Sequence, residues 1–98
     1  MGKSIHREEY EELIGLLREW RVRSGVKQID ISSALGRSQS FISDVERGER
    51  RLDVVELRDF CQLIGTDLVS FVRQYERRLE KSIKRSKTGL GRTRRSRG

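Results

Sequence analysis

The stretch from Lys27 to Gly48 constrains the fold of this chain more than any other. Apolar residues recur at helical spacing on both sides of Gly36, at Ile31, Leu35, Ile42 and Val45. A glycine after such a run marks the end of a helix because it tolerates a positive φ, and Gly48 ends the second run in the same way. Ser38 is suited to cap the second helix. The stretch therefore predicts two short helices, over residues 28–35 and 39–47, joined by a tight turn.

Three further helices are predicted outside this stretch. The first runs from residue 6 or 7 to Ser24, and its apolar stripe comprises Tyr10, Leu13, Leu17 and Trp20. Another begins after Asp53, which forms a capping-box signature with Glu56, and ends at Gly65. The last has Asp67 as its N-cap and an apolar stripe that continues to residue 83. The chain is therefore predicted to be all-α, with a compact five-helix domain.

Charge is distributed unevenly along the 98 residues. Residues 1–80 contain 14 Lys/Arg and 15 Asp/Glu, whereas residues 81–98 contain 8 Lys/Arg and no acidic residue. A block of like charge with few apolar groups predicts disorder, because nothing offsets the entropy of ordering it. We therefore expect an N-terminal arm over residues 1–8, the five-helix domain over 9–80 and a disordered basic tail over 81–98.

Composition excludes several classes of protein. Cys61 is the single cysteine and His6 the single histidine, so neither a disulfide nor a metal site is predicted, and no cofactor is expected. No apolar run approaches the roughly 20 residues of a membrane helix, and the start lacks the core of a signal peptide. We therefore expect a cytoplasmic protein that does not contact the membrane. The sequence contains no recognisable carboxylate pair, nucleophile–base set or glycine-rich phosphate loop, so an enzyme is not expected.

The two helices of residues 28–47 carry a specific set of residues. Gln28 and Gln39 each stand in the first turn of a predicted helix, and the run from Ser38 to Ser43 is followed by Glu46, Arg47 and Gly48. Further matches lie at Leu17, Trp20, Arg21, Gly25, Val26, Ile31, Leu35, Gly36, Leu57, Cys61, Gly65 and Leu68. Over residues 13–72 the chain resembles the lambda-repressor and Cro (Xre-like) family of helix-turn-helix regulators. It departs from the family's usual pattern at Lys27, Ser32 and Leu52.

The resemblance implies a sequence-specific regulator of transcription that binds double-stranded DNA. We expect a repressor of prokaryotic or phage origin, associated with the nucleoid, that places residues 39–47 in the major groove. The resemblance also implies that Gln28 grips a phosphate. Basic residues flanking the recognition helix are phosphate candidates, the alternative being solvated surface charge: Lys27, Arg37, Arg47, Arg50 and Arg51.

Base contacts are expected from the polar side of the recognition helix, at Gln39, Ser40, Ser43 and Asp44. For Asp44 the alternative is a pairing with Arg47 or Arg37 that only orients them. Phe41 either touches a thymine methyl or packs on the first helices, and packing is favoured. The resemblance further implies that Arg21 bridges to Glu46 and fixes the recognition helix on the first helix.

The family's usual mode implies a homodimer on a palindromic operator. The interface is expected on the last helix, at Phe71, Val72, Tyr75 and Leu79. The alternative is that Leu68, Phe71 and Val72 close the core while Tyr75 and Leu79 are merely exposed.

The basic tail and the function as a whole have alternatives too. The tail is expected to anchor the protein on DNA, but it could instead bind RNA or serve solubility. Two other functions remain open for the chain: an antitoxin or anti-regulator that works through a protein partner, and an RNA-binding factor led by the tail.

Overall fold

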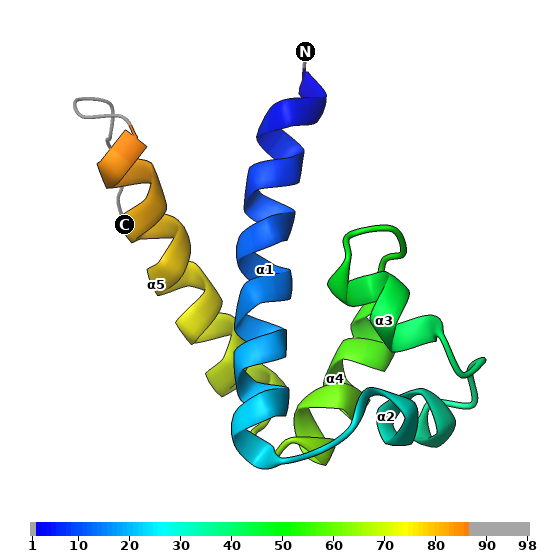
Figure 1. Cartoon of the computed structure of the whole chain (residues 1–98). Helices are drawn as coiled ribbons and strands as arrows, with labels where there is room; N and C mark the ends of the chain where they lie inside the picture. Colours follow the sequence, from blue (N-terminus) through cyan, green and yellow to red (C-terminus); the bar gives the residue numbers. More distant parts are fainter. Residues whose placement is uncertain (1, 87–98) are drawn as a thin grey trace.

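The helices follow one another through short turns, with α1 in the middle of the fold (Figure 1). The structure is a computed structural model that describes the backbone of residues 2–86 and the side chains of residues 8–82. Its elements are α1 (Gly2–Ser24), α2 (Gln28–Ala34), α3 (Phe41–Glu46), α4 (Val54–Leu63) and α5 (Leu68–Ser86). No strand occurs in residues 2–86, so the predicted all-α, five-helix fold is confirmed.

The starts of α4 and α5 are set by local side-chain capping. Asp53 Oδ1 accepts from the Glu56 amide at 2.8 Å, and the Glu56 carboxylate accepts from the Asp53 amide at 3.2 Å. At the next helix, Asp67 Oδ2 accepts from the Ser70 amide at 3.0 Å. These bonds satisfy amide groups that have no partner within their own helix. Both predicted caps are confirmed.

A single core joins all five helices. Its large, fully buried side chains include Leu17 of α1, Phe60 of α4 and Phe71 of α5. The two short helices contribute Ile31, Phe41, Ile42 and Val45. Burial of a large apolar side chain stabilises a fold by about 1.5–3 kcal/mol, so this core is what holds the short helices in place.

The ends of the two long helices differ from those predicted. Helix α1 begins at Gly2, so residues 2–8, expected as an arm, continue the helix. Helix α5 continues to Ser86, so residues 81–86, expected in the tail, are helical. Both extensions are free of proline and of internal glycine, and a helix that is already nucleated continues through charged residues. Residues 87–98, the rest of the predicted disordered tail, lie outside the described residues.

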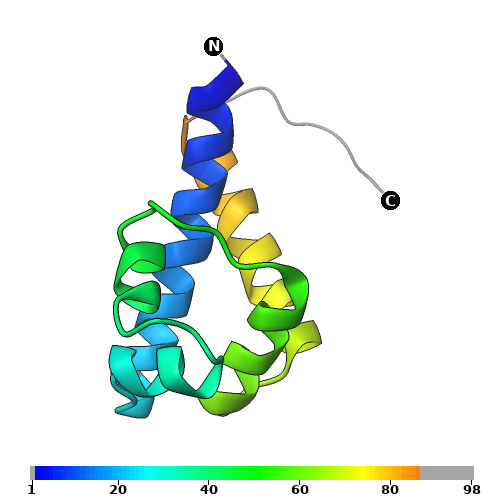
Figure 2. The same ribbon diagram turned by 90° about the vertical axis from the view of Figure 1, so that its right-hand side faces the viewer.

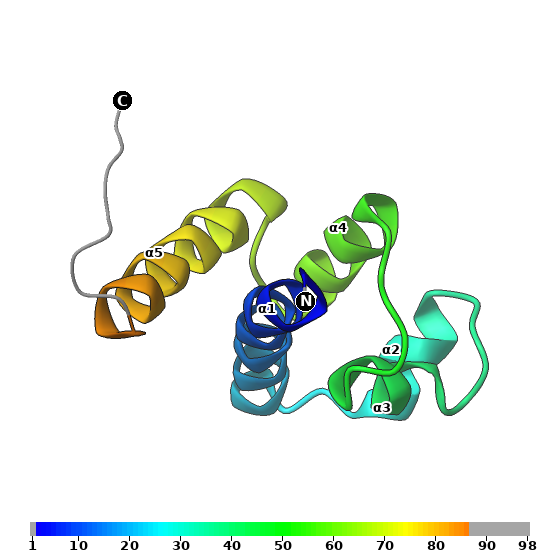
Figure 3. The same ribbon diagram turned by 90° about the horizontal axis from the view of Figure 1, so that it is seen from above.

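Helix α1 separates α5 from the α2–α3 pair, as the view from above shows (Figure 3). The two long helices run antiparallel, converging where α5 begins and diverging toward the amino end of α1 (Figure 1). The turned view shows α3 beside α1, with α2 and α4 below it (Figure 2). The fold therefore has two sides: the α2–α3 pair on one flank of α1, and α5 on the other.

Candidate nucleic-acid interface

The turn between α2 and α3 is closed by backbone hydrogen bonds. The Gly36 amide donates to Ser33 O and the Arg37 amide to Ser32 O, both at 2.9 Å. Gly36 has φ 72°, a left-handed conformation that favours glycine. Together these features form a Schellman motif, which ends α2 and turns the chain sharply toward α3.

Helix α3 is shorter than predicted at its start. A turn closed by the Phe41 amide on Ser38 O, at 3.0 Å, precedes it, so the N-cap is Ser40 and not Ser38. The Ser40 side chain makes no capping hydrogen bond. As a result, Gln39 and Ser40 lie in the turn that leads into α3 rather than on the helix itself.

The side chains of this region divide between core and solvent. Gln39 and Ser40 are exposed, and Ser43 and Asp44 are half-buried. Phe41 is only 1% exposed, so it packs in the core, the alternative that the sequence analysis favours. The exposed polar residues therefore form a short surface at the amino end of α3.

Glu46, the last residue of α3, lies at the centre of a buried polar network. Arg21 donates to its carboxylate twice, Nε to Oε2 at 2.6 Å and Nη2 to Oε1 at 3.1 Å. The side chains of Arg21 and Glu46 are 12% and 5% exposed. Gln28 Nε2 also donates to Glu46 Oε1, at 2.9 Å, and Arg18 lies 3.8 Å away. The carboxylate thus ties α3 to α1 and α2, and the bridge to Arg21 is the one that the resemblance implies.

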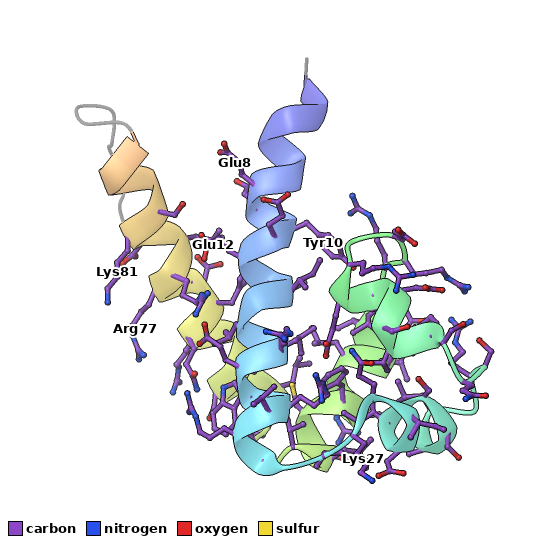
Figure 4. All side chains as sticks on the ribbon, in the orientation of Figure 1. Glu8, Tyr10, Glu12, Lys27, Arg77 and Lys81 are labelled. Atoms are coloured by element: carbon purple, nitrogen blue, oxygen red, sulfur yellow. The ribbon has the colours of Figure 1, made fainter. Side chains whose placement is uncertain are left out.

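Gln28 is half-buried and contributes a hydrogen bond between α2 and α3. Because its amide nitrogen donates to Glu46, its side chain is oriented along the face that α2 presents to α3. Lys27, the N-cap of α2, is exposed and makes no capping bond (Figure 4). These two residues mark the amino end of α2 at the surface.

Two arginines stack on the edge of the core. The guanidinium of Arg37 lies 4.2 Å from the centre of the Phe41 ring and that of Arg50 lies 5.0 Å from it. Arg37 Nε also donates to Glu56 Oε2 at 2.7 Å. These contacts limit the positions of both guanidiniums while leaving the residues exposed.

The remaining phosphate candidates follow α3. Arg47 pairs with Asp44 and with Glu49, and hydrogen bonding to Glu49 raises the pKa of Arg47 above its ordinary value. Arg51 lies 4.6 Å from the centre of the Tyr10 ring, and Tyr10 points from α1 toward this segment (Figure 4). Four of the five basic candidates are therefore held by neighbouring side chains. Asp44 pairs with Arg47, as in the alternative to a base contact given in the sequence analysis.

Comparisons with known proteins agree with this geometry. A family model for the helix-turn-helix domain matches residues 12–74. An XRE-family like protein from Pseudomonas syringae pv. tomato str. DC3000 is similar to this chain, with 44% identity and a TM-score of 0.70 over 79% of this chain and 94% of that one. This chain belongs to the Xre-like helix-turn-helix family.

Two more distant structures share the fold of this Xre-like protein. The restriction-modification controller protein C.Esp1396I is 18% identical, with a TM-score of 0.65 over 74% of this chain and 95% of that one. The clp gene regulator ClgR from Corynebacterium glutamicum is 20% identical, with a TM-score of 0.61 over 81% of this chain and 94% of that one. No curated protein matches the chain.

The predicted dimer interface on α5 needs correction in this Xre-like protein. Phe71 is fully buried in the core of the protomer, and the hydroxyl of Tyr75 donates to Glu9 O of α1 at 3.0 Å. Phe71 therefore belongs to the core, because its side of α5 packs against α1 and α4. Among residues 68–82 of the helix, the exposed large apolar side chains are Val69 and Val72, 60% and 38% exposed. Leu79 is half-buried.

One buried polar residue was not predicted as part of the site. Ser32 of α2 is fully buried, and its hydroxyl accepts from the Ile42 amide of α3 at 3.0 Å. The signals in the sequence were a polar residue on the inward face of α2, next to Ile31, and the departure from the family's usual pattern at Ser32. Elsewhere in residues 8–82 no cluster of side chains could hold a metal ion, and none of the described helices could span a membrane.

Proposed function

We propose that this Xre-like protein is a sequence-specific, double-stranded DNA-binding regulator of transcription that acts as a repressor by occupying an operator. Residues 39–47 enter the major groove, and the protein works in the cytoplasm on the nucleoid. The Glu46 network carries this proposal, because it holds the short helix α3 with its amino end at the surface. A rigidly held polar surface suits base recognition, which depends on placing hydrogen-bonding groups accurately.

The polar side chains have different roles in this proposal. Gln39 and Ser40 are exposed at the amino end of α3 and contact bases, Gln39 through the two hydrogen bonds its amide can make with adenine. Ser43 and Asp44 lie further along the helix. Since Asp44 is paired with Arg47, its role is to orient that guanidinium in addition to accepting from a base.

Basic residues around α3 hold the DNA backbone. Lys27 and Gln28 meet a phosphate at the amino end of α2, while the arginines meet phosphates on either side of the recognition helix, at Arg37, Arg47, Arg50 and Arg51. Stacking on Phe41 and Tyr10 already restricts the arginine side chains, so they lose less conformational entropy when they bind DNA. The basic residues of the tail add sequence-independent phosphate contacts.

The protein binds a palindromic operator as a homodimer in this proposal. Val69 and Val72 form an exposed apolar strip of α5, flanked by Arg73, Glu76 and Arg77. Val72 belongs to the interface expected from the sequence, whereas Phe71 lies in the core. Sedimentation of the wild type and of Val72→Asp tests this. A wild type that is monomeric at tens of micromolar and binds its operator as one protomer would exclude the homodimer.

Selection of binding sites from random DNA duplexes tests the function directly. We expect an enriched half-site repeated as an inverted pair, with centres about 34–36 Å or a multiple of it apart. Competition by RNA of equal length separates this function from RNA binding, which would make RNA the better competitor. Absence of any enriched sequence, together with co-purification of a second protein, would favour an antitoxin or anti-regulator.

A further inference from the structure

A single residue of α2 holds both ends of the segment that presents the base-contacting side chains. The carbonyl oxygen of Ser32 accepts from the Arg37 amide at 2.9 Å, and its hydroxyl oxygen accepts from the Ile42 amide at 3.0 Å. Gln39 and Ser40 lie between these two attachment points and are exposed. The segment from residue 37 to residue 42 is therefore a loop closed on Ser32.

The bond from the hydroxyl replaces a cap that α3 lacks. An N-cap side chain normally accepts from the second or third amide of its helix, but Ser40 makes no such bond. Ile42 is the second residue of α3 and is fully buried, so water cannot satisfy its amide. Ser32, itself fully buried, supplies the acceptor from the neighbouring helix.

A second hydrogen bond joins α2 and α3 one helical turn away from the first on each helix. Gln28 stands one turn before Ser32, and Glu46 stands one turn after Ile42. Gln28 bonds the carboxyl end of α3 through Glu46, while Ser32 bonds its amino end. Together the two bonds oppose sliding of α3 along α2 and rotation of α3 about its own axis. Without the Ser32 bond, only the end far from Gln39 is held by a polar contact to α2.

We propose that Ser32 is a positioning residue for sequence recognition: it fixes Gln39 and Ser40 relative to α2, and so increases discrimination between DNA sequences without touching DNA. This inference rests on the proposed function. It differs from a role in stability alone. A loss of stability lowers the amount of folded protein and weakens binding to all duplexes equally, whereas a misplaced Gln39 weakens binding to the operator only.

The experiment compares Ser32→Ala with the matched control Ser33→Ala. Ser33 is the next residue of α2 and is exposed. Each change therefore removes one serine hydroxyl, from a buried site in Ser32→Ala and from an exposed site in Ser33→Ala. We measure hydrogen exchange at the Ile42 amide and the ratio of dissociation constants for a scrambled duplex and the selected operator. Ser32→Ala should lower that ratio about fivefold to tenfold, the size expected for one lost hydrogen bond, and speed exchange at Ile42. Ser33→Ala should change neither.

A second variant, Ser32→Thr, keeps the hydroxyl acceptor and should keep both the ratio and the slow exchange at Ile42. An unchanged ratio in Ser32→Ala, or a low ratio in Ser32→Thr despite slow exchange at Ile42, would overturn the inference while leaving the proposed function in place. If the wild type itself does not distinguish the operator from the scrambled duplex, the proposed function fails instead. The exchange measurement, made without DNA, still tests the bond in that case.

Discussion

The helices on the two flanks of α1 are held in place by different kinds of contact. On one flank, the 7-residue α2 and 6-residue α3 are joined through polar groups that are almost fully buried, with Ser32 at 0% exposure and the Glu46 side chain at 5%. On the other, the 19-residue α5 shares the apolar core with α1, but its ion pairs with α1 are made by half-exposed groups: Arg78 at 31%, Glu12 at 29% and Glu19 at 51%. The buried contacts lie beside the proposed DNA surface.

Helix length explains this difference. Helices shorter than about 12–15 residues are marginal on their own, so α2 and α3 depend on tertiary contacts for their existence and their angle. Buried polar bonds are directional and costly to leave unpaired, which makes them suited to fixing that angle. The long helices satisfy their own backbone, and their exposed ion pairs only adjust how they lie against each other. Substitutions on the α2–α3 flank should therefore have larger effects than substitutions on the α5 flank.

The largest effect is expected from Glu46→Gln. The change keeps the shape of the side chain but leaves the charge of Arg21, which is 12% exposed, without its counter-ion. Breaking a buried pair from one side costs about 3–5 kcal/mol, and we expect the free energy of unfolding to fall by about 3 kcal/mol. Urea unfolding measures this. Glu49→Gln is the control, because Glu49 is 62% exposed and its loss should cost little. Equal effects of the two changes would contradict the central role of the network.

The next effect concerns binding and separates base contacts from phosphate contacts. Gln39→Ala should weaken operator binding by about 1–3 kcal/mol and relax the preference at one base position. Lys27→Ala should weaken binding to every duplex alike and reduce the salt dependence of binding by about one ion. Titration of operator and scrambled duplexes at several salt concentrations distinguishes the two. A uniform loss in Gln39→Ala would show that Gln39 does not contact a base.

The sequence was sufficient to predict the fold because its local signals agree with one another. Gly36, Asp53 and Asp67 each occur where a helix must start or end, and each acts there as predicted. The start of α3 was predicted too early because Ser38 and Ser40 are equally suitable caps by type. In the structure Ser40 is the N-cap, and Phe41, which begins the helix, is packed in the core.

The positions of individual side chains were harder to predict for a related reason. A period of 3.6 residues shows which residues of α5 share a face, but not which part of that face other helices cover. For this reason Phe71 was placed at a dimer interface, although it is buried in the core. Ser32 was missed because its partner is a backbone amide, which carries no signal in the sequence.

A smaller effect is expected on the α5 flank, at Gly15 of α1. The guanidinium of Arg78 bonds Glu12 at 3.2 Å and Glu19 at 3.0 Å, and a Cβ at Gly15 would lie 3.1 Å from its Nη2. Figure 4 shows Glu12 on α1 pointing toward α5. Glycine costs a helix about 1 kcal/mol relative to alanine. Gly15→Ala should nevertheless leave stability almost unchanged, because the gain in helix propensity is offset by displacement of Arg78.

Removal of Arg78 should release that gain. Arg78→Ala alone should cost no more than about 1 kcal/mol, since its ion pairs are partly exposed. In the Arg78→Ala background, Gly15→Ala should stabilise the protein by about 0.5–1 kcal/mol. Thermal unfolding of the four proteins in this double-mutant cycle measures the coupling. Purely additive effects would mean that Gly15 does not accommodate Arg78.

Cys61 of α4, a fully buried member of the core, allows a last comparison of the two flanks. Burial, with a smaller effect of Asp67, raises the pKa of the Cys61 thiol from 9.0 to about 11. A raised pKa for this acid means that the folded protein keeps the neutral thiol at pH 8, and only the thiolate reacts readily. Cys61 is fully buried, so alkylation at pH 8 should require opening of the core. Glu46→Gln should then speed alkylation by the factor by which it raises the equilibrium constant of opening, about tenfold for each 1.4 kcal/mol of lost stability. Arg78→Ala should change the rate much less. Equal, fast alkylation in both variants and the wild type would place Cys61 in a locally open part of the core.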